Sequence, residues 1–79
     1  MNERKHKQII GIADRLREIR EELGYNVSDM CYALYLEREE YIRLETGDPN
    51  YSLLIYETLL DLMETYLEEA KKLRGKTNG

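Results

Sequence analysis

The sequence contains no tryptophan, no phenylalanine, and only one histidine, one proline and one cysteine. The lone Cys31 excludes an internal disulfide, and no group of Cys and His residues has the spacing of metal ligands. No apolar run approaches the roughly 18 residues of a membrane span, and the segment 9–13 is too short for the apolar region of a signal peptide. We therefore expect a cytoplasmic protein without a metal site or a membrane partner.

The elements of a catalytic site are also missing. There is no glycine-rich loop to hold a phosphate, and no nucleophile stands beside an identifiable base. Glu39 and Glu40 are adjacent, so on a helix their carboxylates do not converge on one point. The seven tyrosines are more typical of core and interface residues than of stacking platforms for bases. We expect neither enzymatic activity nor a cofactor.

The chain has 79 residues, which allows one domain, and its hydrophobic share of 42% favours a packed core over disorder. A chain of this size buries only about 60% of the surface that it exposes when unfolded, so its stability is marginal. Without a disulfide or a metal, the remaining means of stabilisation are helix packing and self-association.

Charge is distributed unevenly around a net value of −4. Residues 1–20 carry six bases and three acids (+3), residues 21–70 carry thirteen acids and two bases (−11), and the tail adds four bases (+4). We interpret residues 1–11 as a basic N-terminal arm whose Arg4, Lys5 and Lys7 reach a phosphate backbone. The alternative is a solvated, frayed end of the chain.

Apolar spacing predicts helices throughout, with glycines where they end. Ile12, Leu16, Ile19 and Leu23 mark one helical face before Gly24. Asn26 is a candidate N-cap for a short second helix, a third helix ends before Gly47, and Ser52 caps a long last helix over 52–74. We expect an all-α domain of four to five helices over 12–74 and a flexible tail over 75–79.

The segment between Gly24 and Gly47 resembles the Cro/lambda-repressor-like (xenobiotic-response-element, XRE) helix-turn-helix family. The matching residues are Leu16-Arg17-Glu18-Ile19-Arg20, then the run from Gly24 to Glu37, then Tyr41-Ile42-Arg43-Leu44-Glu45-Thr46-Gly47, with no gap between the two glycines. The resemblance covers about residues 12–63. It implies a compact helix-turn-helix domain in which 28–46 is the helix-turn-helix unit and 37–46 enters the major groove of DNA.

The resemblance also implies roles for individual residues. It implies an ion pair between Arg20 and Glu45 that ties the first helix to the end of the third. It implies contact with DNA by a set of side chains on the second and third helices: Asn26, Arg38, Glu39 and Arg43.

Three departures weaken the expected DNA surface. Val27 stands where the family has a glutamine that contacts phosphate. Tyr35 replaces the glycine of the turn, where a left-handed conformation would cost roughly 1–2 kcal/mol. Glu37, Glu39 and Glu40 lie on the third helix and would repel a phosphate backbone.

The last helix carries two apolar seams, which is more than one helix needs to pack on a small domain. The first is Leu53, Tyr56, Leu60, Met63, Leu67 and Ala70, and the second is Ile55, Leu59, Leu62 and Tyr66. We predict that the second seam forms a homodimer interface; the alternative is a bend that wraps both seams around the chain's own core.

Two functions remain open from the sequence. The first is a homodimeric DNA-binding transcriptional regulator. The second is a degenerate helix-turn-helix module, antirepressor-like or antitoxin-like, that binds another regulator protein and not DNA.

Overall fold

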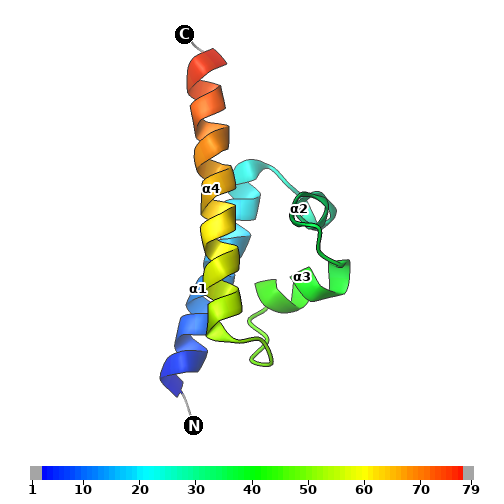
Figure 1. The fold of residues 1–79 in the computed structure, drawn as a ribbon, viewed down its shortest axis with the longest axis vertical. Helices are drawn as coiled ribbons and strands as arrows, with labels where there is room; N and C mark the ends of the chain where they lie inside the picture. The colour runs from blue at the N-terminus through cyan, green and yellow to red at the C-terminus, as the bar shows by residue number, and fades with distance from the viewer. Residues whose placement is uncertain (1–2, 78–79) are drawn as a thin grey trace.

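The computed structural model describes residues 3–77, which form four helices and no strand. The helices are α1 (Glu3–Leu23), α2 (Val27–Leu34), α3 (Arg38–Glu45) and α4 (Leu53–Thr77) (Figure 1). The all-α prediction is confirmed for this part of the chain. None of the helices described is both long and apolar enough to cross a membrane.

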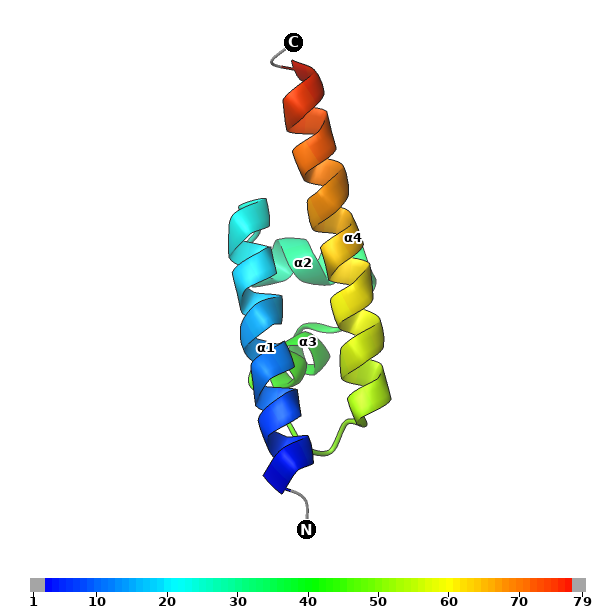
Figure 2. The same ribbon diagram turned by 90° about the vertical axis from the view of Figure 1, so that its left-hand side faces the viewer.

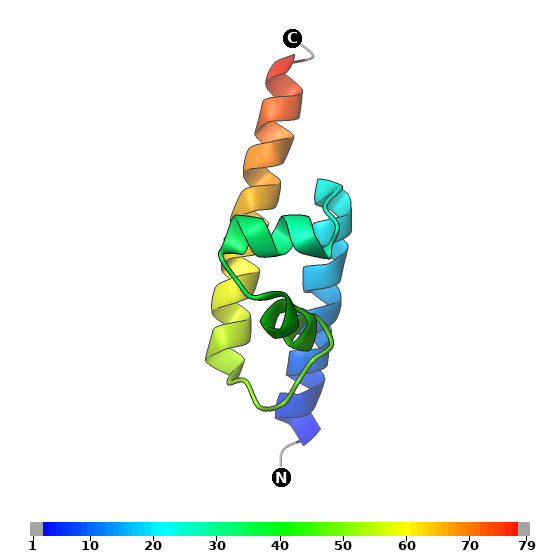
Figure 3. The ribbon, with the colours of Figure 1, turned by 90° about the vertical axis from the view of Figure 1, so that its right-hand side faces the viewer.

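The two long helices, α1 and α4, lie side by side and run in the same direction (Figure 2). The two short helices, α2 and α3, cover one side of this pair, and α4 continues past the end of α1 (Figure 3). The molecule is elongated, with extents of 52 × 24 × 16 Å.

The core lies where α1 and α4 meet the inner faces of α2 and α3. Each helix contributes side chains that are almost completely buried: Leu16 and Ile19 from α1, Met30 from α2, Tyr41 from α3, and Tyr56 and Met63 from α4. Cys31 is also buried, and burial raises the pKa of its thiol, so it acts as a small apolar side chain.

The prediction that residues 1–11 form an arm is wrong for the residues described, because α1 begins at Glu3. The cause is Ile9, which is only 1% exposed and continues the apolar face at the spacing of Ala13 and Leu16. Burying one large apolar side chain contributes about 1.5–3 kcal/mol, which holds the first turns of the helix in place. Met1 and Asn2 lie outside the described residues.

The prediction of a flexible tail from residue 75 is also corrected, since α4 includes Gly75 and ends at Thr77. Glycine inside a helix costs only about 1 kcal/mol relative to alanine, and Gly75 has no left-handed conformation that would end the helix. Residues 78 and 79 of the predicted tail lie outside the described part of the chain.

The predicted helix ends at Gly24 and Gly47 are present, and both glycines are left-handed with φ of 78° and 82°. Asn26 caps α2 as predicted: its side chain accepts a hydrogen bond from the Asp29 N–H at 2.8 Å, and the Asp29 carboxylate accepts one from the Asn26 N–H at 3.0 Å. At the start of α4, the Ser52 hydroxyl accepts a hydrogen bond from the Ile55 N–H at 3.2 Å. Each of these helix ends is therefore set by a glycine or a capping residue that the sequence already shows.

Tyr56 fixes the connection between α3 and α4. Its buried hydroxyl donates a hydrogen bond of 2.8 Å to the carbonyl oxygen of Asp48. Burial raises the pKa of Tyr56 to about 12, so the neutral, donating form persists over the ordinary pH range. Gly47 begins this connection, and a Cβ added there would lie 2.7 Å from Cδ1 of Ile10, so α1 packs closely on it.

Candidate nucleic-acid interface

A bidentate ion pair joins α1 to the end of α3. Nε of Arg20 lies 2.8 Å from one carboxylate oxygen of Glu45, and Nη2 lies 3.0 Å from the other. Their side chains are only 14% and 12% exposed. Burial alone would raise the pKa of Glu45, but the hydrogen bonds and positive charge of Arg20, together with the nearby Tyr41 hydroxyl and the Arg17 charge, hold the pKa below its ordinary value. The pair implied by the resemblance is therefore present and fixes α3 relative to α1.

The connection between α2 and α3 has three residues, 35–37. Tyr35 adopts the left-handed conformation, with φ of 57° and ψ of 41°, at the position where the family has glycine. The Leu36 N–H donates to the carbonyl oxygen of Cys31 at 3.0 Å, which closes the turn. The turn therefore forms as it would with glycine, at the strain cost that Tyr35 brings, roughly 1–2 kcal/mol.

The outer face of α3 holds the residues predicted to read DNA. Arg43, Glu39 and Ile42 are exposed there. The Arg43 guanidinium has no ion pair within residues 3–77. Arg38 is exposed at the first turn, but its Nη1 donates to the hydroxyl oxygen of Ser28 on α2 at 2.9 Å. Arg43 is therefore available for a ligand, whereas Arg38 also links the two short helices.

The start of α3 is acidic for a structural reason. Glu37 is the N-cap, and Glu39 and Glu40 lie in the first turn. The Glu37 N–H donates to Oε1 of Glu40 at 3.4 Å, and carboxylates here stabilise the partial positive charge of a helix N-terminus. The same carboxylates occupy the position at which a helix N-terminus would attract a phosphate, which weakens that contact.

Asn26, at the start of α2, keeps one polar group free for a ligand. The carbonyl oxygen of the Asn26 side chain serves as the cap, and its NH₂ group has no hydrogen bond among the described residues. Val27 is partly buried against the core, so the residue that replaces the family's glutamine has a packing role. Of the phosphate contacts expected at the start of α2, only that of Asn26 therefore remains.

The basic residues at the chain start lie apart from the outer face of α3. Arg4, Lys5 and Lys7 are exposed on the first turns of α1. These turns end beside the connection between α3 and α4, where Ile10 approaches Gly47 (Figure 3). Because they belong to a helix, they add positive charge at this end of the molecule and do not wrap around a duplex.

Two exposed tyrosines, on α2 and in the turn that follows it, were not among the predicted site residues. Tyr32 on α2 is 87% exposed and Tyr35 in the turn is 94% exposed. The exposure of both could have been anticipated, because Tyr32 falls opposite Met30 on a short helix and Tyr35 stands at the turn position that the resemblance identifies.

The predicted dimer seam on α4 is divided by the structure. Ile55 and Leu62 are exposed, as a free seam requires, but Leu59 is buried within the chain. The Tyr66 hydroxyl donates a hydrogen bond of 3.1 Å to the carbonyl oxygen of Ala33, so Tyr66 anchors α2 on α4. The alternative, in which α4 also packs on its own core, therefore applies to Leu59 and Tyr66.

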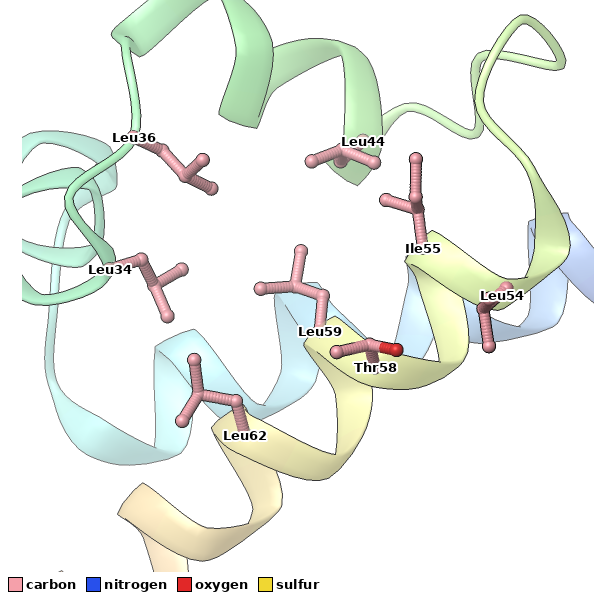
Figure 4. A pocket seen from close by; sticks show the side chains of 8 residues that line it. All are labelled: Leu34, Leu36, Leu44, Leu54, Ile55, Thr58, Leu59 and Leu62. Carbon is pink, nitrogen blue, oxygen red and sulfur yellow. The ribbon is translucent and has the colours of Figure 1, made fainter.

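The exposed part of the seam borders an apolar groove between α4 and the short helices (Figure 4). The groove has a volume of about 370 Å³, and Thr58 is the only lining residue with a polar side chain. Its walls are Leu34, Leu36 and Leu44 on one side and Leu54, Ile55, Thr58, Leu59 and Leu62 on the other. We call this feature the α4 groove.

No family model, no curated protein and no solved structure matches the chain. Within residues 3–77 no group of three or more His, Cys, Asp or Glu residues could hold a metal ion.

Proposed function

We propose that the protein is a DNA-binding transcriptional regulator of the Cro/lambda-repressor-like helix-turn-helix type, with α3 entering the major groove. The observation that carries the proposal is the position of α3. It is clamped to α1 through Arg20 and Glu45, it follows α2 after a three-residue turn, and its outer face carries the unpaired Arg43. A rigid, exposed helix with an available guanidinium has the form that reads base edges.

The roles of the remaining groups follow from their positions. Arg43 would donate to the O6 and N7 acceptors of a guanine, while the NH₂ group of Asn26 would contact a phosphate. Arg38 links α2 to α3 through its hydrogen bond with Ser28. It lies in the first turn of α3, so it would also face the major groove of the DNA. Glu39 would accept from a cytosine amino group or, at other bases, reduce affinity.

The regulator would act as a homodimer through the α4 groove. Each copy carries both a groove and an adjacent exposed ridge, since Leu54 is 71% exposed and Ile55 and Leu62 are also exposed. A two-fold interface needs such self-complementarity, and here it would bury no charge, because the groove lining contains none. A dimer would present two α3 helices to the half-sites of a palindrome.

Replacing Leu54 by glutamate tests the dimer. The wild type is expected at twice the 9.4 kDa chain mass in light scattering at micromolar concentration, and Leu54→Glu at the mass of a single chain. Leu54 is already exposed in the single chain, so the variant keeps its fold. Tyr35→Glu, at a site that is also exposed and lies outside the groove, is the control and stays dimeric. A wild type that scatters as a single chain throughout this range would refute the interface.

Anisotropy of a labelled duplex pool of mixed sequence at low salt tests DNA binding. We expect Arg43→Ala to weaken binding by roughly 10-fold, in line with about 1–3 kcal/mol for a good Arg–guanine contact. Arg17→Ala removes an exposed base on α1 that pairs with Asp14, and it is the matched control with little effect. Equal affinities for the wild type and Arg43→Ala would show that α3 does not contact DNA.

One observation favours a second candidate, a module that binds another protein and not DNA. Tyr35, which is 94% exposed, lies two residues before Glu37 at the acidic start of α3, and aromatic residues are enriched at protein interfaces. If the duplex pool does not bind at low salt while the protein is folded, this candidate becomes the preferred one.

A further inference from the structure

A recess lies where the end of α1 meets the outer side of α2, away from the α4 groove. Its volume is about 470 Å³. The lining residues come from both helices and the turn between them: Leu23, Gly24, Tyr25, Asp29, Tyr32 and Ala33. We call it the α1–α2 recess. The proposed reading of DNA by α3 uses none of these side chains.

Two kinds of side chain in the recess favour a cation. The Asp29 carboxylate receives one hydrogen bond, from the Asn26 N–H at 3.0 Å, and has no ion pair within residues 3–77. The rings of Tyr25 and Tyr32 are both exposed, and they form no ring contact with each other in the described structure. Two exposed tyrosine rings and a carboxylate that line the same recess are groups that attract a guanidinium or an ammonium group.

Carbonyl groups at the end of α1 already accept hydrogen bonds from two guanidinium groups. Carbonyl groups at a helix C-terminus are without partners inside the helix, and they attract cations. The protein already uses this end in that way: Nη1 of Arg20 donates to the carbonyl oxygen of Tyr25 at 3.0 Å, and Nη2 of Arg74 donates to that of Glu22 at 3.4 Å. Neither arginine lines the recess, and no other basic residue does.

The size and the apolar walls indicate how the cation is presented. A volume of about 470 Å³ exceeds a single guanidinium group and accommodates a whole long side chain. Leu23 and Ala33 supply apolar surface for its methylene stem, and Asp29 with the two rings supplies the charged end. We propose that the α1–α2 recess binds an arginine or lysine side chain of a partner protein.

The charge of the surrounding chain supports the same partner. Residues 21–70 carry thirteen acids and two bases, so the region that contains α2 and α3 attracts a basic segment at long range. This inference is independent of DNA binding, and its test contains no DNA. It would hold equally for a regulator that binds a second protein while on its operator and for a module that binds protein alone.

The test uses two blocked tripeptides, glycyl-arginyl-glycine and the same peptide with citrulline, which has the shape of arginine without its charge. Amide chemical shifts of the ¹⁵N-labelled protein are followed at physiological salt. We expect the arginine peptide to shift the amides of Gly24, Tyr25 and Ala33, and the citrulline peptide to leave them unchanged. Tyr32→Ala should weaken binding about 3- to 10-fold, the range expected when one cation–π contact is lost.

Two variants separate binding from stability. Tyr32→Phe keeps an aromatic face and is expected to retain the affinity of the wild type, while Tyr35→Ala, an exposed tyrosine outside the recess, is expected to have no effect. Equal shifts with citrulline would overturn the proposal. So would shifts spread over the acidic faces of α1 and α4, or an affinity that Tyr32→Ala leaves unchanged.

Discussion

Arg20 and Glu45 show how two residues define the position of a whole helix. Both are nearly buried, both oxygens of the carboxylate are used, and the distances of 2.8 and 3.0 Å are those of a strong charge-assisted pair. A planar guanidinium paired in this way fixes orientation as well as distance, which lysine cannot do. The pair thereby determines which face of α3 is turned outward.

Removing either partner is expected to cost about 2–4 kcal/mol of unfolding free energy, because the remaining charge loses its hydrogen bonds close to the core. In a double-mutant cycle, Arg20→Ala and Glu45→Ala should couple by about 1–3 kcal/mol, measured by urea unfolding with circular dichroism. Arg17→Ala, whose exposed pair with Asp14 lies within α1, is the control and should cost under about 0.5 kcal/mol. Additive effects of the two substitutions would contradict the pair.

The same pair predicts a pH dependence. The pKa of Glu45 is lower in the folded than in the unfolded chain, where its ordinary value is 4.5. The unfolded chain therefore binds the proton first, so the contribution of the pair is complete above pH 4.5 and is lost as pH falls through the folded pKa. The coupling energy of the cycle should decline over the same range of acid pH.

Among the four helices described, α1 differs most from its prediction. From the sequence, the first helix was predicted to begin at residue 12, because charge dominates residues 3–7 and a charged chain end is usually frayed. The structure begins it at Glu3, because Ile9 packs in the core. The basic residues therefore belong to a rigid helix, and in the proposed complex with DNA they would contribute general electrostatic attraction.

Two neighbouring isoleucines test this extension of α1. Ile9 is 1% exposed and Ile10 is 36% exposed. Ile9→Ala should cost about 2–4 kcal/mol through the cavity that it leaves, whereas Ile10→Ala should cost under about 1 kcal/mol. Thermal or urea unfolding measures both. If residues 3–11 were a free arm, the two substitutions would have equally small effects.

Local signals predicted the helices and their ends, because caps and glycines act within a few residues. The Asn26 cap, the left-handed Gly24 and Gly47, and the Ser52 cap were all readable in this way. Contacts between distant residues could not be predicted, because the spacing of apolar residues does not show which other helix packs on a given helix face. The bonds from Arg38 to Ser28 and from Tyr66 to Ala33 are of this kind, and they changed the roles of two predicted site residues.

At the scale of the whole molecule, the charges and the apolar surfaces lie on different parts of the fold. The start of α1 is basic, α2 and α3 lie in the acidic region, and the α4 groove carries no charge. This separation leaves room for a different partner at each surface: we propose a second copy for the groove, DNA for the outer face of α3, and a basic side chain for the α1–α2 recess. Loss of one interaction should therefore leave the others measurable.

The salt dependence of wild-type binding tests the proposal that α3 binds duplex DNA despite its acidic first turn. Anisotropy of the mixed duplex pool should give a binding constant whose logarithm falls linearly with the logarithm of salt concentration, by about 0.9 per phosphate neutralised. Glu39→Gln should strengthen binding, because it removes a negative charge beside the backbone. No anisotropy change at the lowest salt, with circular dichroism showing a folded helical protein, would contradict the account.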